Sequence, residues 1–110
     1  MASTKDYVDY VCERVNGFGM INAKKMFGEY MVYINAKPIL LICDNTVYVK
    51  MLEEINAAMA EEETGHPYNG AKLHYILDVE NEELMHRVVP VLEKITKIPV
   101  KKKKKSEVGV

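Results

Sequence analysis

The sequence has little of what marks metal sites, nucleotide sites and secreted proteins. It contains two cysteines, three histidines and six glycines in 110 residues, and the glycines form no phosphate-binding pattern. Cys12 and Cys43 lack the close spacing of a zinc knuckle or a redox pair, so we expect two free, buried thiols. His66, His74 and His86 lack the i, i+4 pairing of a zinc site. The sequence therefore predicts no metal site and no cofactor.

Long apolar runs are also missing. None approaches the roughly 20 residues of a membrane span, and the first ten residues, MASTKDYVDY, contain no hydrophobic targeting segment. We expect a soluble cytoplasmic protein without a membrane partner. Cys12 and a distant histidine could form a nucleophile and its base, but the apolar residues around Cys12 favour packing.

Charge is distributed unevenly along the chain. The net charge is −1, but residues 101–110 carry +4 and residues 1–100 carry −5. An acidic domain repels the phosphates of nucleic acid. We therefore expect direct binding of nucleic acid only weakly, through the lysines of 101–110. The predicted organisation is one domain over 1–100, followed by a lysine-rich tail over 101–110.

We expect the rest of the chain to pack around residues 25–50. Short alternating runs separated by turn residues predict a β-meander with strands over 26–34, 38–43 and 46–50. Asn35-Ala36-Lys37 and Asp44-Asn45 are the predicted turns. A fourth strand is expected over 72–78.

Three helices are expected around this sheet. Ser3 or Thr4 caps the first, which runs to about Asn16, and residues 17–23 form a loop. An Ala- and Glu-rich helix covers 53–63. The third begins after the N-cap Asn81, continues through a kink at Pro90 and ends before residue 99. The fold class is thus α+β: an antiparallel β-meander sheet of four or five strands with an N-terminal helix, a middle helix and a long C-terminal helix.

The strand over 38–43 is apolar on both sides. Ile39, Leu41 and Cys43 face one way, and Leu40 and Ile42 face the other. The three expected helices offer too little apolar surface to cover both faces, so we expect a homodimer through the sheet or the first helix.

Aromatic residues are mostly tyrosines, with seven Tyr against two Phe. Tyr30, Tyr33, Tyr48 and Tyr75 fall on predicted strands, where a tyrosine suits a core edge or an interface. Stacking on nucleic-acid bases is the alternative, and the acidic body disfavours it.

The meander and its flanks resemble the amino-terminal domain of the TfoX (Sxy) competence regulators. The resemblance covers roughly residues 4–98 and rests on these segments: Met26-Phe27-Gly28-Glu29-Tyr30 with Tyr33, Leu40-Leu41-Ile42-Cys43-Asp44, Val47-Tyr48-Val49-Lys50 and Leu73-His74-Tyr75. It implies an α+β domain, often dimeric, found in cytoplasmic bacterial proteins. It also implies a link to transcriptional control of DNA uptake and no established catalytic residues. The longer regulators continue into a helical domain, whereas only 101–110 follow here.

Two functions stay open. The first is a non-catalytic regulatory or adaptor domain that acts through an unidentified protein partner, possible roles being transcriptional or competence regulation. The alternative is a small-ligand-binding domain or an enzyme with a pocket near the Met-Phe-Gly strand. For either, the candidate contact residues are Phe27, Tyr30, Lys50 and Tyr75. Lys50 at its strand end could equally be a solvated edge charge.

Overall fold

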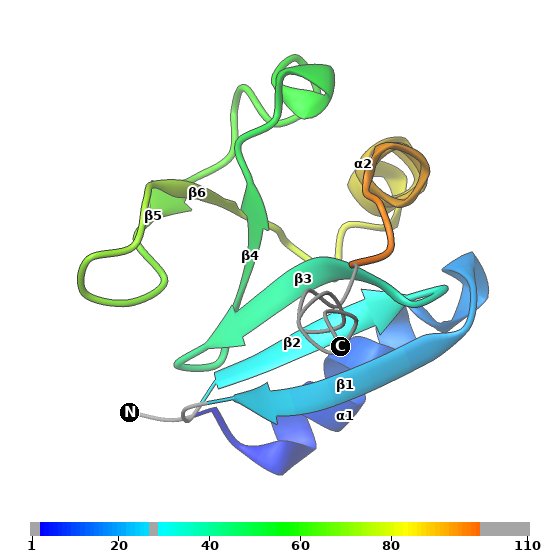
Figure 1. The fold of residues 1–110 in the computed structure, drawn as a ribbon. Helices are drawn as coiled ribbons and strands as arrows, with labels where there is room; N and C mark the ends of the chain where they lie inside the picture. The colour runs from blue at the N-terminus through cyan, green and yellow to red at the C-terminus, as the bar shows by residue number, and fades with distance from the viewer. Residues whose placement is uncertain (1–2, 27–28, 100–110) are drawn as a thin grey trace, which may run out of the picture.

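The computed structural model describes residues 3–26 and 29–99, and within them the chain forms one antiparallel sheet and two α-helices (Figure 1). The strands join in the order β1-β2-β3-β4-β6-β5. This confirms the α+β class, with six strands in place of four or five. The elements are α1 (Lys5–Arg14), η1 (Asn16–Phe18), β1 (Ile21–Met26), β2 (Glu29–Ile34), β3 (Lys37–Cys43), β4 (Thr46–Lys50), η2 (Glu53–Ile55), β5 (Thr64–Gly65), β6 (His74–Ile76) and α2 (Glu82–Ile95).

Two tight turns build the predicted meander. Asn35 and Ala36 join β2 to β3, and Asp44 and Asn45 join β3 to β4, all four with φ between 53° and 69°. Two successive left-handed residues form the type I′ turn, whose twist matches that of paired strands. The predicted turns are confirmed, although Lys37 already belongs to β3.

Helix α1 begins as predicted and is fastened to the second turn. The Thr4 hydroxyl accepts a hydrogen bond from the Tyr7 amide at 3.2 Å, which makes Thr4 the N-cap. The Thr4 amide donates to Asn45 Oδ1 at 2.9 Å, and the Asn45 amide donates to Ser3 Oγ at 3.0 Å. These bonds connect the start of α1 to the β3–β4 hairpin.

One core lies between the sheet and both helices. The register places Val32, Leu40 and Val47 on one side of the sheet, here called the inner face, and all three are buried. The same cluster contains Val11 of α1 and Val88 of α2. In Figure 1 α1 runs under β1 and β2, whereas α2 lies beside β3 at the other end of the curved sheet.

The opposite side of the sheet, here called the outer face, is less covered. Met31, Leu41, Tyr48 and Ile76 are cross-strand neighbours on this face, and each is only partly buried. An antiparallel sheet commonly packs one face on the core and leaves the other partly open. Both helices therefore contribute to the inner core, while apolar surface remains on the outer face.

The predicted middle helix over 53–63 is wrong. Only η2 is helical, and turns follow it to Glu61. Ile55 and Met59 are the fully buried side chains of this segment, so its apolar stripe is a single i, i+4 pair. The segment must also turn back toward the sheet, where the Ile76 amide donates to Glu63 O at 2.9 Å. The burial of Ile55 and Met59 and the return of the chain to the sheet thus override the helix propensity of Ala and Glu.

The predicted loop over 17–23 is also wrong, because β1 begins at Ile21. This strand forms the sheet edge and pairs with β2 alone, and its polar residues Asn22, Lys24 and Lys25 are exposed. An exposed edge strand carries little of the alternating apolar pattern that reveals a strand in sequence. The predicted strand over 26–34 is correspondingly divided between the end of β1 and β2. Residues 27 and 28 lie outside the described residues, as does the lysine-rich tail.

The last helix is confirmed. Asn81 is its N-cap, with Oδ1 accepting from the Leu84 amide at 3.0 Å, and the helix continues through Pro90. The fourth predicted strand, over 72–78, is present in shortened form as β6. Of the helices in the described ranges, none has both the length and the apolar character needed to cross a membrane.

Candidate functional site

The structure describes three of the four candidate contact residues, and these three lie on different sides of the sheet. Tyr30 pairs with Ile42, and Tyr75 pairs with Val49, so both tyrosines belong to the inner face. Lys50 alternates with Val49 and is exposed on the outer face. Phe27 is outside the described residues. The structure thus does not bring Tyr30, Lys50 and Tyr75 together.

The inner-face tyrosines contact the protein itself. Tyr75 is buried, and its hydroxyl donates to Asn56 Oδ1 at 2.7 Å, which ties β6 to the turns after η2. Tyr30 is half-buried against the core and lines a shallow groove of mixed polar and apolar residues between α1 and β1. Both tyrosines use their apolar rings for packing, as expected of a core edge.

A second groove, of about 720 Å³, lies on the outer face and is called the outer groove. Its floor includes Leu41 of β3 and Tyr48 of β4, which are cross-strand partners. One wall is the loop before β6, with Tyr68, and the other is the end of α2, with Leu92 and Ile95. The groove therefore joins three parts of the chain that are far apart in sequence.

Short hydrogen bonds shape the loop wall. The His66 ring Nδ1 lies 2.9 Å from Ala71 O, and the Ala71 amide donates to Tyr68 O at 3.0 Å. The His74 ring Nδ1 lies 2.8 Å from Lys72 O. A carbonyl oxygen only accepts, so Nδ1 of each imidazole carries the proton. These contacts fold the loop over its own backbone and leave Tyr68 half exposed at the groove.

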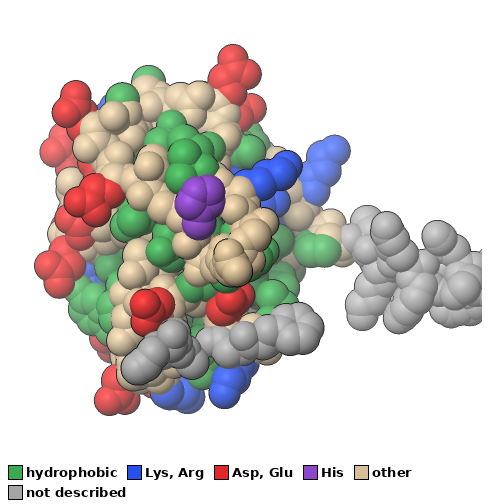
Figure 2. Space-filling model, turned by 90° about the vertical axis from the view of Figure 1, so that its left-hand side faces the viewer, with side chains coloured by type: hydrophobic (Ala, Val, Ile, Leu, Met, Phe, Trp, Pro, Cys, Tyr) green, Lys and Arg blue, Asp and Glu red, His purple; other side chains and the backbone are tan. Residues whose placement is uncertain are grey.

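The charged side chains along the outer groove are all of one sign. Lys50, Lys72 and Lys97 line it together with His74, and its lining contains no aspartate or glutamate. The rest of the domain is acidic, with a net charge of −5 over residues 1–100. In the view of Figure 2, acidic side chains lie along the left margin, at the top and near the lower centre, and basic side chains lie at the upper right and along the lower edge. The outer groove is thus an apolar site with a cationic rim.

Neither cysteine lines the outer groove, and both thiols are in surroundings that favour the protonated form. Burial, aided by nearby Glu29, raises the pKa of the Cys43 thiol to about 12, and burial also raises the pKa of the Cys12 thiol. A protonated thiol is a poor nucleophile. Within residues 3–26 and 29–99, no three His, Cys, Asp or Glu side chains gather as a metal site would require.

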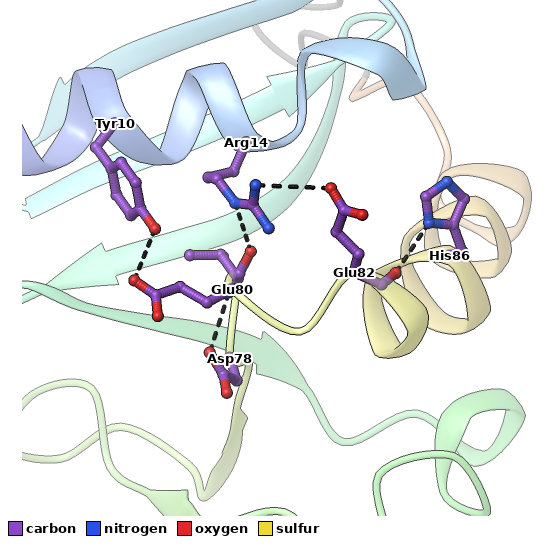
Figure 3. Close-up of polar contacts among 7 residues, drawn as sticks. Tyr10, Arg14, Asp78, Glu80, Glu82 and His86 are labelled. Atoms are coloured by element: carbon purple, nitrogen blue, oxygen red, sulfur yellow. Dashed lines mark hydrogen bonds and ion pairs between the residues drawn. The ribbon is translucent and has the colours of Figure 1, made fainter.

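A cluster of polar contacts connects the two helices (Figure 3). Arg14, at the end of α1, donates from Nε to Val79 O at 2.8 Å and lies 3.7 Å from Glu82 Oε2 at the start of α2. The Tyr10 hydroxyl donates to Glu80 Oε2 at 2.9 Å. Each donor meets an acceptor of the neighbouring element, so this cluster holds α1 against the β6–α2 connection.

The sequence selects Lys50, and strand alternation places Tyr48 on the same side of its strand. It does not identify His74 as a contact residue, because His74 enters only among the residues of the family resemblance and as a rejected metal ligand. The alternation of apolar residues in 72–78 identified a strand, but it could not show that this strand pairs with β4. Only that pairing sets His74 beside Lys50.

Comparison with known proteins agrees with the predicted resemblance. Residues 13–90 match the family model of the TfoX N-terminal domain. The chain is also similar to a protein of Spirochaeta aurantia described as "Uncharacterized 12.7 kDa protein in trpE 5'region", with 31% identity over 83 residues. That alignment covers 76% of this chain and 72% of the relative. The chain therefore belongs to the TfoX N-terminal domain family.

Proposed function

We propose that this protein is a non-catalytic regulatory or adaptor domain that acts through protein contacts. The observation that carries the proposal is the outer groove, where Leu41 and Tyr48 stay partly exposed beside a cationic rim. Partly exposed apolar surface bordered by polar groups is characteristic of interaction sites. Because the chain shares its domain with the TfoX competence regulators, we propose a cytoplasmic role in transcriptional or competence regulation.

Partner capture by two matched variants tests this proposal. Tyr68→Asp places a charge at the groove, and Met20→Asp makes a similar change at a residue that does not line it. Both side chains are at least half exposed, at 50% and 77%, so neither variant should unfold the domain. We expect immobilised wild type and Met20→Asp to retain the same cytoplasmic proteins and Tyr68→Asp to lose them. Equal retention by all three would contradict a protein-binding role for the groove.

A small-ligand-binding domain is the second candidate. The volume of about 720 Å³ lies within the roughly 300–1,000 Å³ of small-molecule sites. A ligand present at a hundredfold its dissociation constant should add about 2.7 kcal/mol of apparent stability. A thermal-shift screen with metabolites that finds such a ligand, with loss of the shift in Tyr68→Asp, would favour this candidate over the adaptor.

We also propose that the domain forms a homodimer through the outer face of β1 and β2. Tyr33 on β2 is half-buried there, with Lys24 Nζ 5.6 Å from its ring centroid, and Met26 of β1 is exposed. Tyr33 does not line the outer groove. A contact centred on Tyr33 and Met26, toward the β1 edge, would cover apolar surface next to the groove, which it would meet at Met31 of β2.

A further inference from the structure

We propose that the outer groove binds an acidic amphipathic helix of the partner protein, with apolar side chains on Leu41 and Tyr48 and carboxylates near Lys50 and Lys72. This inference rests on the proposed function and specifies the chemistry of the partner. The groove's charge, the apolar side chains of its floor and the position of its strands in the sheet each favour such a ligand.

Charge complementarity selects an acidic ligand. Three lysines and a histidine line the groove without an acidic side chain, although the domain around them has a surplus of carboxylates. Lys50 and Lys72 are both exposed, so their ammonium groups remain available to a ligand. Complementary charges accelerate encounter and exclude partners of the wrong sign. The acidic remainder of the domain would repel an acidic segment elsewhere and so direct it to the groove.

The floor selects a ligand with an apolar side. Leu41 and Tyr48 are partly exposed at the base of the groove, and Ile95 is partly exposed on the α2 wall. The His74 and Tyr48 rings are nearly perpendicular, with their centroids 6.4 Å apart. Covering these side chains with aliphatic or aromatic groups would remove apolar surface from water.

The sheet order selects a helix over a strand. β4 lies between β3 and β6, so its backbone groups are already used on both sides. A peptide at this place cannot extend the sheet by backbone pairing, which needs a free edge. Recognition must instead use side chains, and an amphipathic helix presents apolar residues at i, i+3, i+4 and i+7 to such a groove.

Synthetic peptides and the full chain provide the test. The first peptide is a labelled helix of about 14 residues, long enough for about four turns, with Leu and Phe on one face and Glu on the other. The second has the same composition in scrambled order, and the third carries Lys in place of Glu. Fluorescence polarisation should show binding of the first peptide, weaker binding of the second and none of the third.

Matched lysine variants assign the binding to the groove. Lys50→Met with Lys72→Met should weaken binding of the acidic peptide about tenfold, which corresponds to about 1.4 kcal/mol. Lys25→Met with Lys94→Met removes the same charge from exposed residues that do not line the groove, and it should leave binding unchanged. Circular dichroism before and after heating checks that both double variants are folded.

Several results would overturn the inference. Equal losses in the two double variants would show non-specific attraction, and equal binding of all three peptides would show that neither charge nor amphipathic order matters. Binding of a DNA oligonucleotide that depends on Lys50 and Lys72, without peptide binding, would assign the groove to nucleic acid. A changed sedimentation coefficient in the groove variant alone would assign it to a second copy of this chain. If the peptide fails while partner capture still depends on Tyr68, the protein-binding function survives and only the helix inference is lost.

Discussion

Lys50 on β4 and His74 on β6 are directly paired across the antiparallel ladder, so their side chains lie next to each other on the outer face. Cross-strand partners have Cβ atoms about 4.5–5.5 Å apart. The His74 ring also lies nearly perpendicular to the ring of Tyr48, which precedes Lys50 on the same face of β4. This pair therefore connects the cationic rim of the outer groove to its apolar floor.

Substitution of Lys50 by Met tests whether the lysine serves binding or only solubility. The side chain is exposed, so Lys50→Met should change the free energy of unfolding by less than about 0.5 kcal/mol. It should also reduce retention of the protein partner, because the rim loses one of its cations. Melting temperature and partner capture are measured on the same preparation. Unchanged capture would remove Lys50 from the candidate site.

The homodimer can be separated from the groove by Tyr33→Glu. This change places a carboxylate on the outer face of β2 and should convert a dimer into a monomer of 12.6 kDa. Sedimentation velocity at micromolar concentration measures the change, and Tyr68→Asp serves as the control that should remain dimeric. A wild-type protein that stays monomeric on concentration would contradict the proposed dimer.

Ala36 is the residue of the two hairpin turns whose conformation is most costly. It has φ of 69°, where the Cβ of an alanine is strained and a glycine is not. We expect Ala36→Gly to raise the free energy of unfolding by about 0.5–1 kcal/mol, since relief of strain exceeds the added entropy of the unfolded chain. Asp44→Gly should gain less, because aspartate tolerates the left-handed region at its φ of 53°. Urea denaturation of both variants checks the order, and an equal gain in the two would contradict this account.

Protonation of Glu93 should lower the stability of the domain in acid. Hydrogen bonds from Asn35 and from Lys37, which lies 3.1 Å away, hold the pKa of the Glu93 carboxyl below its usual value of 4.5. A lowered folded pKa gives stability that is complete above the unfolded pKa and is lost as the pH falls through the folded pKa. Urea denaturation of wild type and Glu93→Gln across this range should show a shallower loss below pH 4.5 in the variant. Parallel pH profiles would count against the assigned contacts.

Cys43 should resist alkylation until the protein unfolds. Its side chain is 3% exposed, and burial raises the pKa of the thiol from 9.0 to about 12, so little thiolate forms at about pH 8. Cys12 is only partly buried and should react faster with iodoacetamide. Mass spectrometry over time gives both rates, and guanidinium chloride should equalise them. Rapid modification of Cys43 in the folded protein would be inconsistent with its position in β3.

Local chemistry in the sequence determined the elements of this fold that can be recognised one at a time. Asn35, Asp44 and Asn45 between short alternating runs specify two hairpins, because asparagine and aspartate accept the left-handed conformation of a type I′ turn. Thr4 and Asn81 specify helix starts, because their side chains satisfy free backbone amides. These signals were sufficient for the α+β class and the meander, whereas the resemblance to the family rested on the motif segments within 26–50 and 73–75.

Tertiary structure alone decided which segments meet. Edge strand β1 has too few apolar residues to be recognised without its pairing to β2, and the segment after η2 gives up its helix in order to return to the sheet. The outer groove depends on β4 pairing with β6 and on the end of α2 lying close to that face. Residue type and spacing fix which way a side chain points within its own element. Its neighbours on other elements follow from how the whole chain buries its apolar surface, and no local pattern records that.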